Sequence, residues 1–202
     1  MNKRPLCAAC QRPQKVCLCP MLTPVVHRTP VHVLMHPSEQ HNAKGTAKIL
    51  CRMLTQGQLW IGENEDEFTL LQQTLSQGPQ PIWLLYPDAK ARAIESLPKH
   101  ASTPTVGQLL VLDGTWRKTL KLLQLNPWLQ RLPKVTFAQA PRGHYQIRKA
   151  KRHDSLSTLE AVSYALEQLE QLDSSPLQQA FEALKQTQLA HMPTAVQARY
   201  QQ

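Results

Sequence analysis

Long hydrophobic runs are missing from this sequence of 202 residues. The longest apolar stretches fall far short of the roughly 20 residues that a transmembrane helix needs. The first residues, MNKRPLCAAC, also lack the apolar segment of a secretory signal. We therefore expect a protein of the reducing cytoplasm with no membrane partner. Hydrophobic residues make up 42% of the chain, which predicts a packed core rather than disorder.

Acidic residues are scarce in two blocks of the chain. Residues 1–60 contain eight Lys/Arg and one acid, Glu39, and residues 113–152 contain ten Lys/Arg and one acid, Asp113. The other two parts are net acidic, so the formal charge of +9 is concentrated rather than evenly spread. This segregation favours a polyanionic partner, most simply a nucleic acid, over a merely solvated basic surface.

The chain also lacks internal repeats and low-complexity tracts, and after a Cys-rich start its segments alternate between two patterns. Apolar runs predict strands at 31–36, 58–62, 81–86, 108–113 and 134–138. Helical spacing predicts helices at 43–54, 65–75, 88–96, 116–125, 157–172 and 176–190. The alternation is typical of an α/β domain with a mostly parallel sheet and flanking helices. We predict two units, a small metal-binding element at 1–24 and a main domain at 25–202.

Four cysteines gather near the N-terminus as C-x2-C-x6-C-x-C, at Cys7, Cys10, Cys17 and Cys19. Four thiolates at this spacing can close a tetrahedral metal site. The segment is too short and polar to form its own core, so the metal would supply its folding energy. We predict structural zinc, with an iron–sulfur cluster as the main alternative. Two disulfides are not expected without secretion.

The fifth cysteine, Cys51, stands alone on a predicted helix, where a buried core thiol is favoured over a nucleophile. The eight histidines show no metal-binding pattern. His32 and His36 share one face of a predicted strand, where packing or surface positions are the usual explanation.

The stretch LDGTW ends the predicted strand at 108–113 in an acid, a glycine and a tryptophan. In parallel α/β sheets, ligands bind beyond the carboxyl ends of the strands, which is where Asp113 would lie. Gly114 would permit a sharp turn or a close ligand approach. Asp113 could instead cap the helix that begins near Thr115. The basic turn at Arg117 and Lys118 suits an anionic partner and favours a catalytic role.

A second polar cluster opens the long helix predicted at 157–172. Ser157 and Glu160 have the spacing of a capping box, so these residues could serve only to start the helix. A helix N-terminus can also hold a ligand carboxylate. The preceding residues 142–152 carry five Lys/Arg and no acid, which predicts phosphate contacts.

Taken in order, these motifs resemble the DTW-domain family. The resemblance is carried by the four-Cys cluster, HPSE (36–39), LLYP (84–87), LDGTW (112–116) and YQIRKA…STLEA (145–161), and it covers most of the chain. It implies a fold related to SPOUT enzymes, with a C-terminal knot that forms the cofactor site. The family includes tRNA-uridine aminocarboxypropyltransferases.

The implied reaction moves the 3-amino-3-carboxypropyl group of S-adenosylmethionine to N3 of a tRNA uridine and releases methylthioadenosine. Position 47 in the variable loop is the bacterial target that the resemblance implies. A carboxylate at N3 could act as a general base, and Asp113 is our candidate; it could instead hold the amino group of the cofactor. We expect a monomer or a weak homodimer.

The resemblance also implies which residues contact each ligand. The expected cofactor-binding residues are Leu85, Tyr86, Pro87, Leu112, Gly114, Thr115, Trp116, Ser157 and Thr158. Trp116 could wall the site or stack a base, with core packing as the alternative. The expected tRNA-binding residues are Lys3, Arg4, Arg12, Lys15, Arg117, Lys118, Arg142, Arg148, Lys149, Lys151 and Arg152.

Two other functions remain open at this point. A methyltransferase could use the same cofactor and a similar fold, and would leave adenosylhomocysteine as its sulfur product. A non-enzymatic zinc module that binds RNA would need neither Asp113 nor S-adenosylmethionine.

Overall fold

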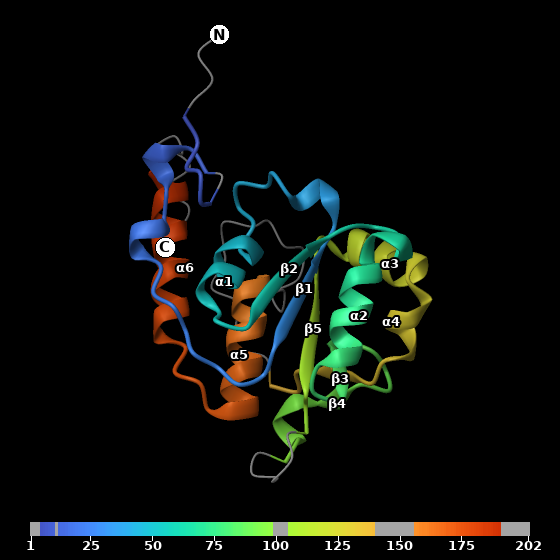
Figure 1. Cartoon of the computed structure of the whole chain (residues 1–202). Coiled ribbons are helices and arrows are strands. Elements are labelled where there is room, and N and C mark those ends of the chain that lie inside the picture. The colour runs from blue at the N-terminus through green and yellow to red at the C-terminus, as the bar shows by residue number, and fades with distance from the viewer. Residues whose placement is uncertain (1–4, 11, 99–104, 140–155, 191–202) are drawn as a thin grey trace.

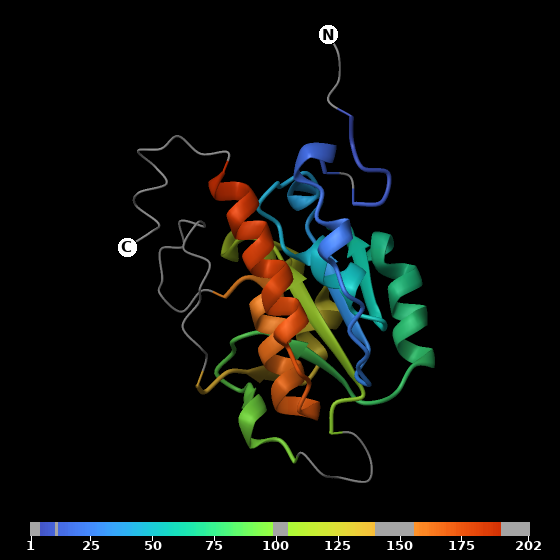
Figure 2. The ribbon, with the colours of Figure 1, turned by 90° about the vertical axis from the view of Figure 1, so that its left-hand side faces the viewer.

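A central β-sheet with helices on both of its faces forms the body of the protein (Figure 1). The structure, a computed structural model, describes residues 5–10, 12–98, 105–139 and 156–190. Helix α1 and the C-terminal helices α5 and α6 cover one face, and α2, α3 and α4 cover the other (Figures 1 and 2).

The sheet has six strands, all parallel to their neighbours, in the order β2-β1-β5-β3-β6-β4. The strands are β1 (Val31–Met35), β2 (Gly57–Ile61), β3 (Ile82–Leu85), β4 (Arg92–Ala93), β5 (Gln108–Asp113) and β6 (Lys134–Thr136). The prediction of a parallel sheet with flanking helices is therefore confirmed. Strand β5 lies between β1 and β3, so its last residue, Asp113, ends near the middle of the sheet.

Six α-helices are described: α1 (Ala47–Met53), α2 (Thr69–Gln77), α3 (Trp116–Leu125), α4 (Pro127–Arg131), α5 (Thr158–Glu170) and α6 (Ser175–Leu189). Short 3-10 helices precede or join them: η1 (Gln14–Val16), η2 (Cys19–Met21), η3 (Pro37–Glu39), η4 (Glu65–Phe68) and η5 (Ile94–Ser96). Among the residues described, no helix has both the length and the apolar character needed to cross a bilayer.

Alternating residues of the strands point to opposite faces of the sheet and pack into two hydrophobic clusters, one on each face. Val31 and Val33 of β1 pack with α1, α5 and α6, whereas Leu34 packs with α2, α3 and α4. Because both faces are buried, strands β1 and β5 read as continuous apolar runs, which is how the sequence revealed them. Leu18 of the Cys-rich element is 1% exposed and joins the first cluster, so the element packs on the main domain.

One predicted element is wrong. The helix expected at 88–96 is absent, and this segment instead forms the two-residue strand β4 followed by η5. Arg92 pairs with Val135 of β6, so the backbone is extended where the sequence suggested a helix. The pairing partner lies about forty residues away, and the local sequence holds no sign of it.

Helix α4 was not predicted, although Pro127 occupies its first turn, where a missing N–H costs nothing. The C-terminal knot that the family resemblance implies is not tested by the described residues, which omit 140–155 between β6 and α5. The knot therefore stays a prediction.

His32, in the middle of β1, is buried in its neutral form. Its Nε2 lies 3.0 Å from Gln108 Oε1, and Trp60 Nε1–H donates to its Nδ1 at 3.3 Å. Burial lowers the pKa of His32, an effect that the bond to Gln108 only partly opposes. Because the unfolded chain binds the proton more readily, the stability that His32 contributes is present above its unfolded pKa of about 6.5 and is lost as pH falls.

We therefore expect the free energy of unfolding to decrease as pH falls from about 7 to about 5.5, by at most about 1.4 kcal/mol per pH unit from this residue. Urea titrations at several pH values measure that slope. His32→Gln should show a shallower slope than the wild type, whatever its stability at neutral pH. An unchanged slope would mean that other groups, such as His27, whose pKa is also lowered by burial, set the pH dependence.

Candidate active site and metal centre

The carboxyl end of β5 brings Asp113 into contact with the start of α5. Asp113 is 6% exposed, and its Oδ1 accepts a hydrogen bond from the hydroxyl of Thr158, which lies 45 residues later in the chain. Thr115, and not Asp113, is the N-cap residue of α3. The N-cap position of α3 therefore belongs to Thr115, and the role of Asp113 stays a prediction. A buried carboxylate fixed between a central strand and a helix N-terminus is suited to hold or accept a proton.

Gly114 is required for close packing rather than for an unusual backbone conformation. No described glycine has a positive φ, and a Cβ at Gly114 would lie 3.0 Å from Cβ of Lys118. The side chain of His36 passes on the other side, with its Cβ at 3.8 Å from that position. A larger residue there would require the side chain of Lys118 to give by a few tenths of an ångström.

Tyr86 and Trp116 form an aromatic pair just beyond the carboxyl ends of β3 and β5, in which Tyr86 is half-buried and Trp116 is exposed. Their ring centroids are 6.3 Å apart in an edge-to-face arrangement, and Trp116 is 53% exposed. Core packing of Trp116 is thereby excluded. Burial, and secondarily the charge of Asp88, raises the pKa of Tyr86, so its hydroxyl stays protonated at neutral pH. The exposed ring of Trp116 offers a flat face for a base or an adenine.

The other expected cofactor-binding residues of β3 and β5 lie beside this pair. Leu85 pairs with Val111 across the two strands, so the segments that follow both strands emerge side by side. Leu85 and Leu112 are half-buried, and Pro87 and Thr115 are exposed. The LLYP and LDGTW motifs, which begin 28 residues apart in the sequence, thus lie side by side at the carboxyl ends of β3 and β5.

Ser157 and Thr158 are buried and already take part in hydrogen bonds. Ser157 Oγ accepts from Glu160 N at 3.3 Å while Glu160 Oε2 accepts from Ser157 N at 2.8 Å, which confirms the capping box. The next donor, Leu159 N, is bonded to Thr46 Oγ1 at 3.2 Å. Most first-turn donors of α5 therefore have partners inside the protein, and a role in binding a ligand carboxylate stays a prediction.

Two acidic residues that we did not predict form ion pairs with basic side chains near the carboxyl ends of the strands. Glu39 is 6% exposed and accepts from Lys118 Nζ and from Asn42 Nδ2, both at 2.7 Å. Lys118, which we expected to bind RNA, is thus paired with a buried acid. The sequence carried one sign of this, because Glu39 is the sole acid in a block of eight basic residues.

Glu63, just after β2, binds His36 and Lys121. Its Oε1 lies 2.7 Å from His36 Nε2 and 2.6 Å from Lys121 Nζ. Ser38 N donates to His36 Nδ1, so the neutral ring carries its proton on Nε2 and donates it to Glu63. Lys121 first, and then His36, lower the pKa of Glu63. These contacts fix the positions of β1, β2 and α3 around the site.

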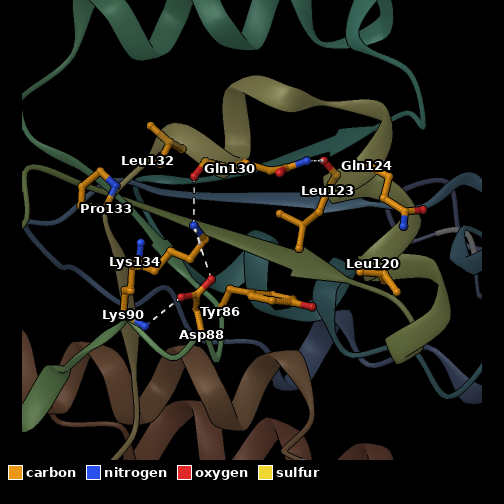
Figure 3. Close-up of a pocket in the computed structure, with 10 residues that line it drawn as sticks. All are labelled: Tyr86, Asp88, Lys90, Leu120, Leu123, Gln124, Gln130, Leu132, Pro133 and Lys134. Atoms are coloured by element: carbon orange, nitrogen blue, oxygen red, sulfur yellow. Dashed lines mark hydrogen bonds and ion pairs between the residues drawn. The ribbon is translucent and has the colours of Figure 1, made fainter.

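A cavity of about 740 Å³ opens next to this edge, between the segment after β3 and helices α3 and α4 (Figure 3). Tyr86 lines it and is the single expected cofactor-binding residue that does so. Lys134 Nζ donates to Gln130 O at 3.0 Å and lies 3.7 Å from Asp88 Oδ2 across the cavity wall. Leu120 and Leu123 of α3 supply the apolar part of the wall.

The four cysteines of the N-terminal element converge on one point. The Sγ atoms of Cys7 and Cys19 are 3.9 Å apart, those of Cys10 and Cys17 are 3.8 Å apart, and all four lie within 4.8 Å of one another. A tetrahedron with metal–sulfur bonds of about 2.3 Å has edges of about 3.8 Å. The cluster therefore fits a single tetrahedral ion. A four-iron cluster binds each thiolate to a different iron and would spread them further.

The thiols of this cluster differ in acidity, as expected for sulfurs that share one small space. A hydrogen bond from the Cys10 backbone, and then one from the Cys17 side chain, lower the pKa of Cys7 to about 6. Burial and the neighbouring thiols raise the pKa of Cys19 to about 12. Four thiolates this close would repel one another. A bound dication would offset that repulsion and stabilise all four in the deprotonated form.

Cys51 of α1 behaves as a packing residue. Burial, and secondarily the charge of Asp113, raise the pKa of its thiol to about 12. The thiol is therefore protonated at neutral pH and packs against the first hydrophobic cluster, as expected for a core cysteine and not for a nucleophile.

The expected RNA-binding residues are divided between two places. Arg12 and Lys15 line a second cavity beside the Cys cluster, and the exposed Arg117 lies on the first turn of α3. The others, Lys3, Arg4, Arg142, Arg148, Lys149, Lys151 and Arg152, lie outside the described residues.

Comparison with known proteins gives consistent matches over most of the chain. The DTW domain model matches residues 4–189. The curated protein tRNA-uridine aminocarboxypropyltransferase 2 from Mus musculus is 32% identical over 201 residues, which cover 94% of this chain and 65% of that relative. Relatives with the same name are 30% identical in Macaca fascicularis (94% and 65% covered) and 31% identical in Drosophila melanogaster (84% and 68% covered).

The chain therefore spans slightly less than two thirds of the length of the two mammalian relatives. No solved structure gives a significant match.

Proposed function

This chain belongs to the DTW-domain family, and on that premise we propose that it transfers a 3-amino-3-carboxypropyl group to N3 of a tRNA uridine. S-adenosylmethionine would supply this group through its sulfonium, whose three attached carbons are all activated. N3 loses its proton and forms a bond to the terminal carbon of the propyl chain. The bond from that carbon to sulfur breaks, its electron pair stays on sulfur, and neutral methylthioadenosine leaves.

The observation that carries the proposal is the position of Asp113. Its carboxylate is 6% exposed, lies at the carboxyl end of a central parallel strand and is held by Thr158. Uridine N3 is a poor nucleophile while it is protonated, so a fixed carboxylate at N3 would raise the rate by accepting that proton. In this proposal Asp113 is the general base, and Thr158 is a positioning residue.

The choice between the propyl carbon and the methyl carbon depends on how the protein folds the cofactor against its surface. The aromatic pair Tyr86 and Trp116 would face the adenine or the uracil ring. The edge formed by Leu85, Pro87, Leu112, Gly114 and Thr115 would contact the rest of the nucleoside. Ser157 and Thr158 would lie near the amino acid end of the cofactor.

We propose further that the four-Cys cluster holds zinc. Zn²⁺ favours four thiolates in a tetrahedron, and four protein ligands leave no open position for a substrate. The ion would therefore be structural. A colourless purified protein with one zinc per chain supports this assignment, and visible absorption from an iron–sulfur cluster would overturn it.

The decisive experiment combines the purified protein with unmodified tRNA and S-adenosylmethionine. We expect one uridine to gain the mass of a 3-amino-3-carboxypropyl group and methylthioadenosine to form in equal amount. Adenosylhomocysteine with a methylated nucleoside would instead identify a methyltransferase. No binding of S-adenosylmethionine by calorimetry, together with tight tRNA binding, would identify a non-enzymatic RNA-binding module.

A further inference from the structure

A basic cleft of about 610 Å³ lies between the Cys cluster and the main domain. Its walls come from residues 12–16, the loop 40–45, helix α1 and the end of α6. Four of its lining residues are basic and none is acidic: Arg12, Lys15, Lys48 and Arg52. A concave surface lined by charge of one sign concentrates its potential on whatever enters.

Two arginines of this cleft join its walls. Arg12 Nη1 donates to Ala43 O at 3.1 Å, and Arg52 Nη1 donates to Ala9 O in the Cys element. Gln188 Nε2 of α6 also donates to Ala43 O, at 2.8 Å. The cleft is therefore a fixed part of the fold, and the arginines keep their positive charge while they bond to backbone carbonyls.

The two lysines of the cleft have a different environment. The side-chain ammonium groups of Lys15 and Lys48 make no hydrogen bond or ion pair with another residue of the described ranges. Four other lysines of the described ranges are paired with acids: Lys118 with Glu39, Lys121 with Glu63, Lys134 with Asp88 and Lys185 with Glu182. Two ammonium groups without an acidic partner, in a cleft lined by no carboxylate, favour binding of an anionic ligand.

We propose that this cleft binds backbone phosphates of the substrate tRNA, away from the uridine that reacts. The inference rests on the proposed function. The cleft has no Phe, Tyr or Trp on which a base could stack, and its donors are cations and amides. Contact with the phosphodiester backbone, independent of base sequence, is the mode that such a lining supports.

The fold places this cleft and the candidate active site at the same end of the molecule. Residues 36–46 run from the carboxyl end of β1 to the cleft (Figures 1 and 2). Within that segment Glu39 bonds Lys118 of α3, Ala43 bonds Arg12 of the Cys element, and Thr46 bonds the start of α5. One RNA molecule bound in the cleft would thus be held in a fixed relation to Asp113.

The test is tRNA binding by the full metal-loaded protein, with the double variant Lys15→Gln/Lys48→Gln. Each phosphate contact contributes a slope of about −0.9 to a plot of log K against log salt, so loss of two contacts should make the slope about 1.8 shallower. We expect about tenfold weaker binding at about 0.1 M salt. Fluorescence anisotropy with unmodified tRNA measures both quantities.

Arg131→Gln is the control for a single lost charge, because the exposed Arg131 at the end of α4 lies on the face of the sheet opposite α1 and α6 and is not among the expected RNA-binding residues. It should bind tRNA like the wild type. Equal effects of Arg131→Gln and Lys48→Gln would mean that net charge, and not the cleft, sets the affinity, which would overturn the inference.

Activity separates this inference from the proposed function. With saturating tRNA the double variant should retain the wild-type turnover, and only the KM for tRNA should rise. If the wild type modifies tRNA but the double variant binds tRNA normally, the proposal that the cleft binds tRNA is refuted and the proposed function is not. A wild type that binds tRNA through the cleft but modifies nothing refutes the proposed function alone. If the double variant loses only binding of inorganic phosphate, the ligand is a small anion and the RNA assignment is wrong.

Discussion

Asp113→Asn is expected to lower the rate of aminocarboxypropyl transfer by about 10²- to 10⁴-fold, the usual contribution of a general base. The amide oxygen of Asn can still accept the hydrogen bond from Thr158, so the fold should persist. Single-turnover measurement of modified uridine gives the rate, and a thermal unfolding curve like that of the wild type shows that the protein remains folded.

The dependence of this variant on pH separates the two roles proposed for Asp113. Without its base, the enzyme relies on solvent to remove the N3 proton, so the rate of Asp113→Asn should rise steadily with pH. If Asp113 instead holds the amino group of the cofactor, the KM for S-adenosylmethionine rises and the pH profile keeps its shape. A variant with the rate and KM of the wild type would contradict both roles.

Thr158 offers a matched pair of variants for the same test. Thr158→Ser keeps the hydroxyl that donates to Asp113 Oδ1, whereas Thr158→Val keeps the shape and removes the donor. We expect the Ser variant to stay within a few-fold of the wild type and the Val variant to lose about tenfold or more, because the buried carboxylate loses the donor that holds it against α5. Similar activity of the two would show that Asp113 needs no partner on α5.

The prediction of the sheet from the sequence succeeded where one local rule decides the structure. Strands covered on both faces must be apolar along their whole length, and the core strands β1 and β5 are of this kind. Strand β4 is different, because it has two residues and exists through pairing with β6. Its formation depends on contacts distant in sequence, which no local pattern records.

The candidate site shows the same division. The position of Asp113 followed from the strand that carries it, since the carboxyl ends of parallel strands are where such sheets bind ligands. Its bond to Thr158 could not be predicted, because it joins two motifs 45 residues apart. The prediction for Lys118 failed to foresee its partner. The sequence suggests a solvent-facing cation, whereas in the fold Lys118 is paired with the buried Glu39.

Removing one cysteine of the cluster should produce the largest structural effect of any single substitution in the N-terminal element. We expect Cys10→Ser to lose the bound metal and to unfold this element, because its chain has almost no core other than Leu18. Structural zinc contributes about 10–16 kcal/mol to the folding of small peptides of this type, far more than one leucine side chain supplies. Elemental analysis, and limited proteolysis of the first 24 residues, measure the two effects.

Cys51→Ser is the control, since Cys51 is a half-buried free thiol that lies on α1 and outside the cluster. It should retain one metal ion per chain. Loss of the metal should also open the basic cleft, because Ala9 and Arg12, which bond Arg52 and Ala43 across it, both belong to the element. Cys10→Ser should therefore weaken tRNA binding at least as much as Lys15→Gln/Lys48→Gln. If it loses the metal but binds tRNA as tightly as the wild type, then the element is not part of the RNA-binding surface.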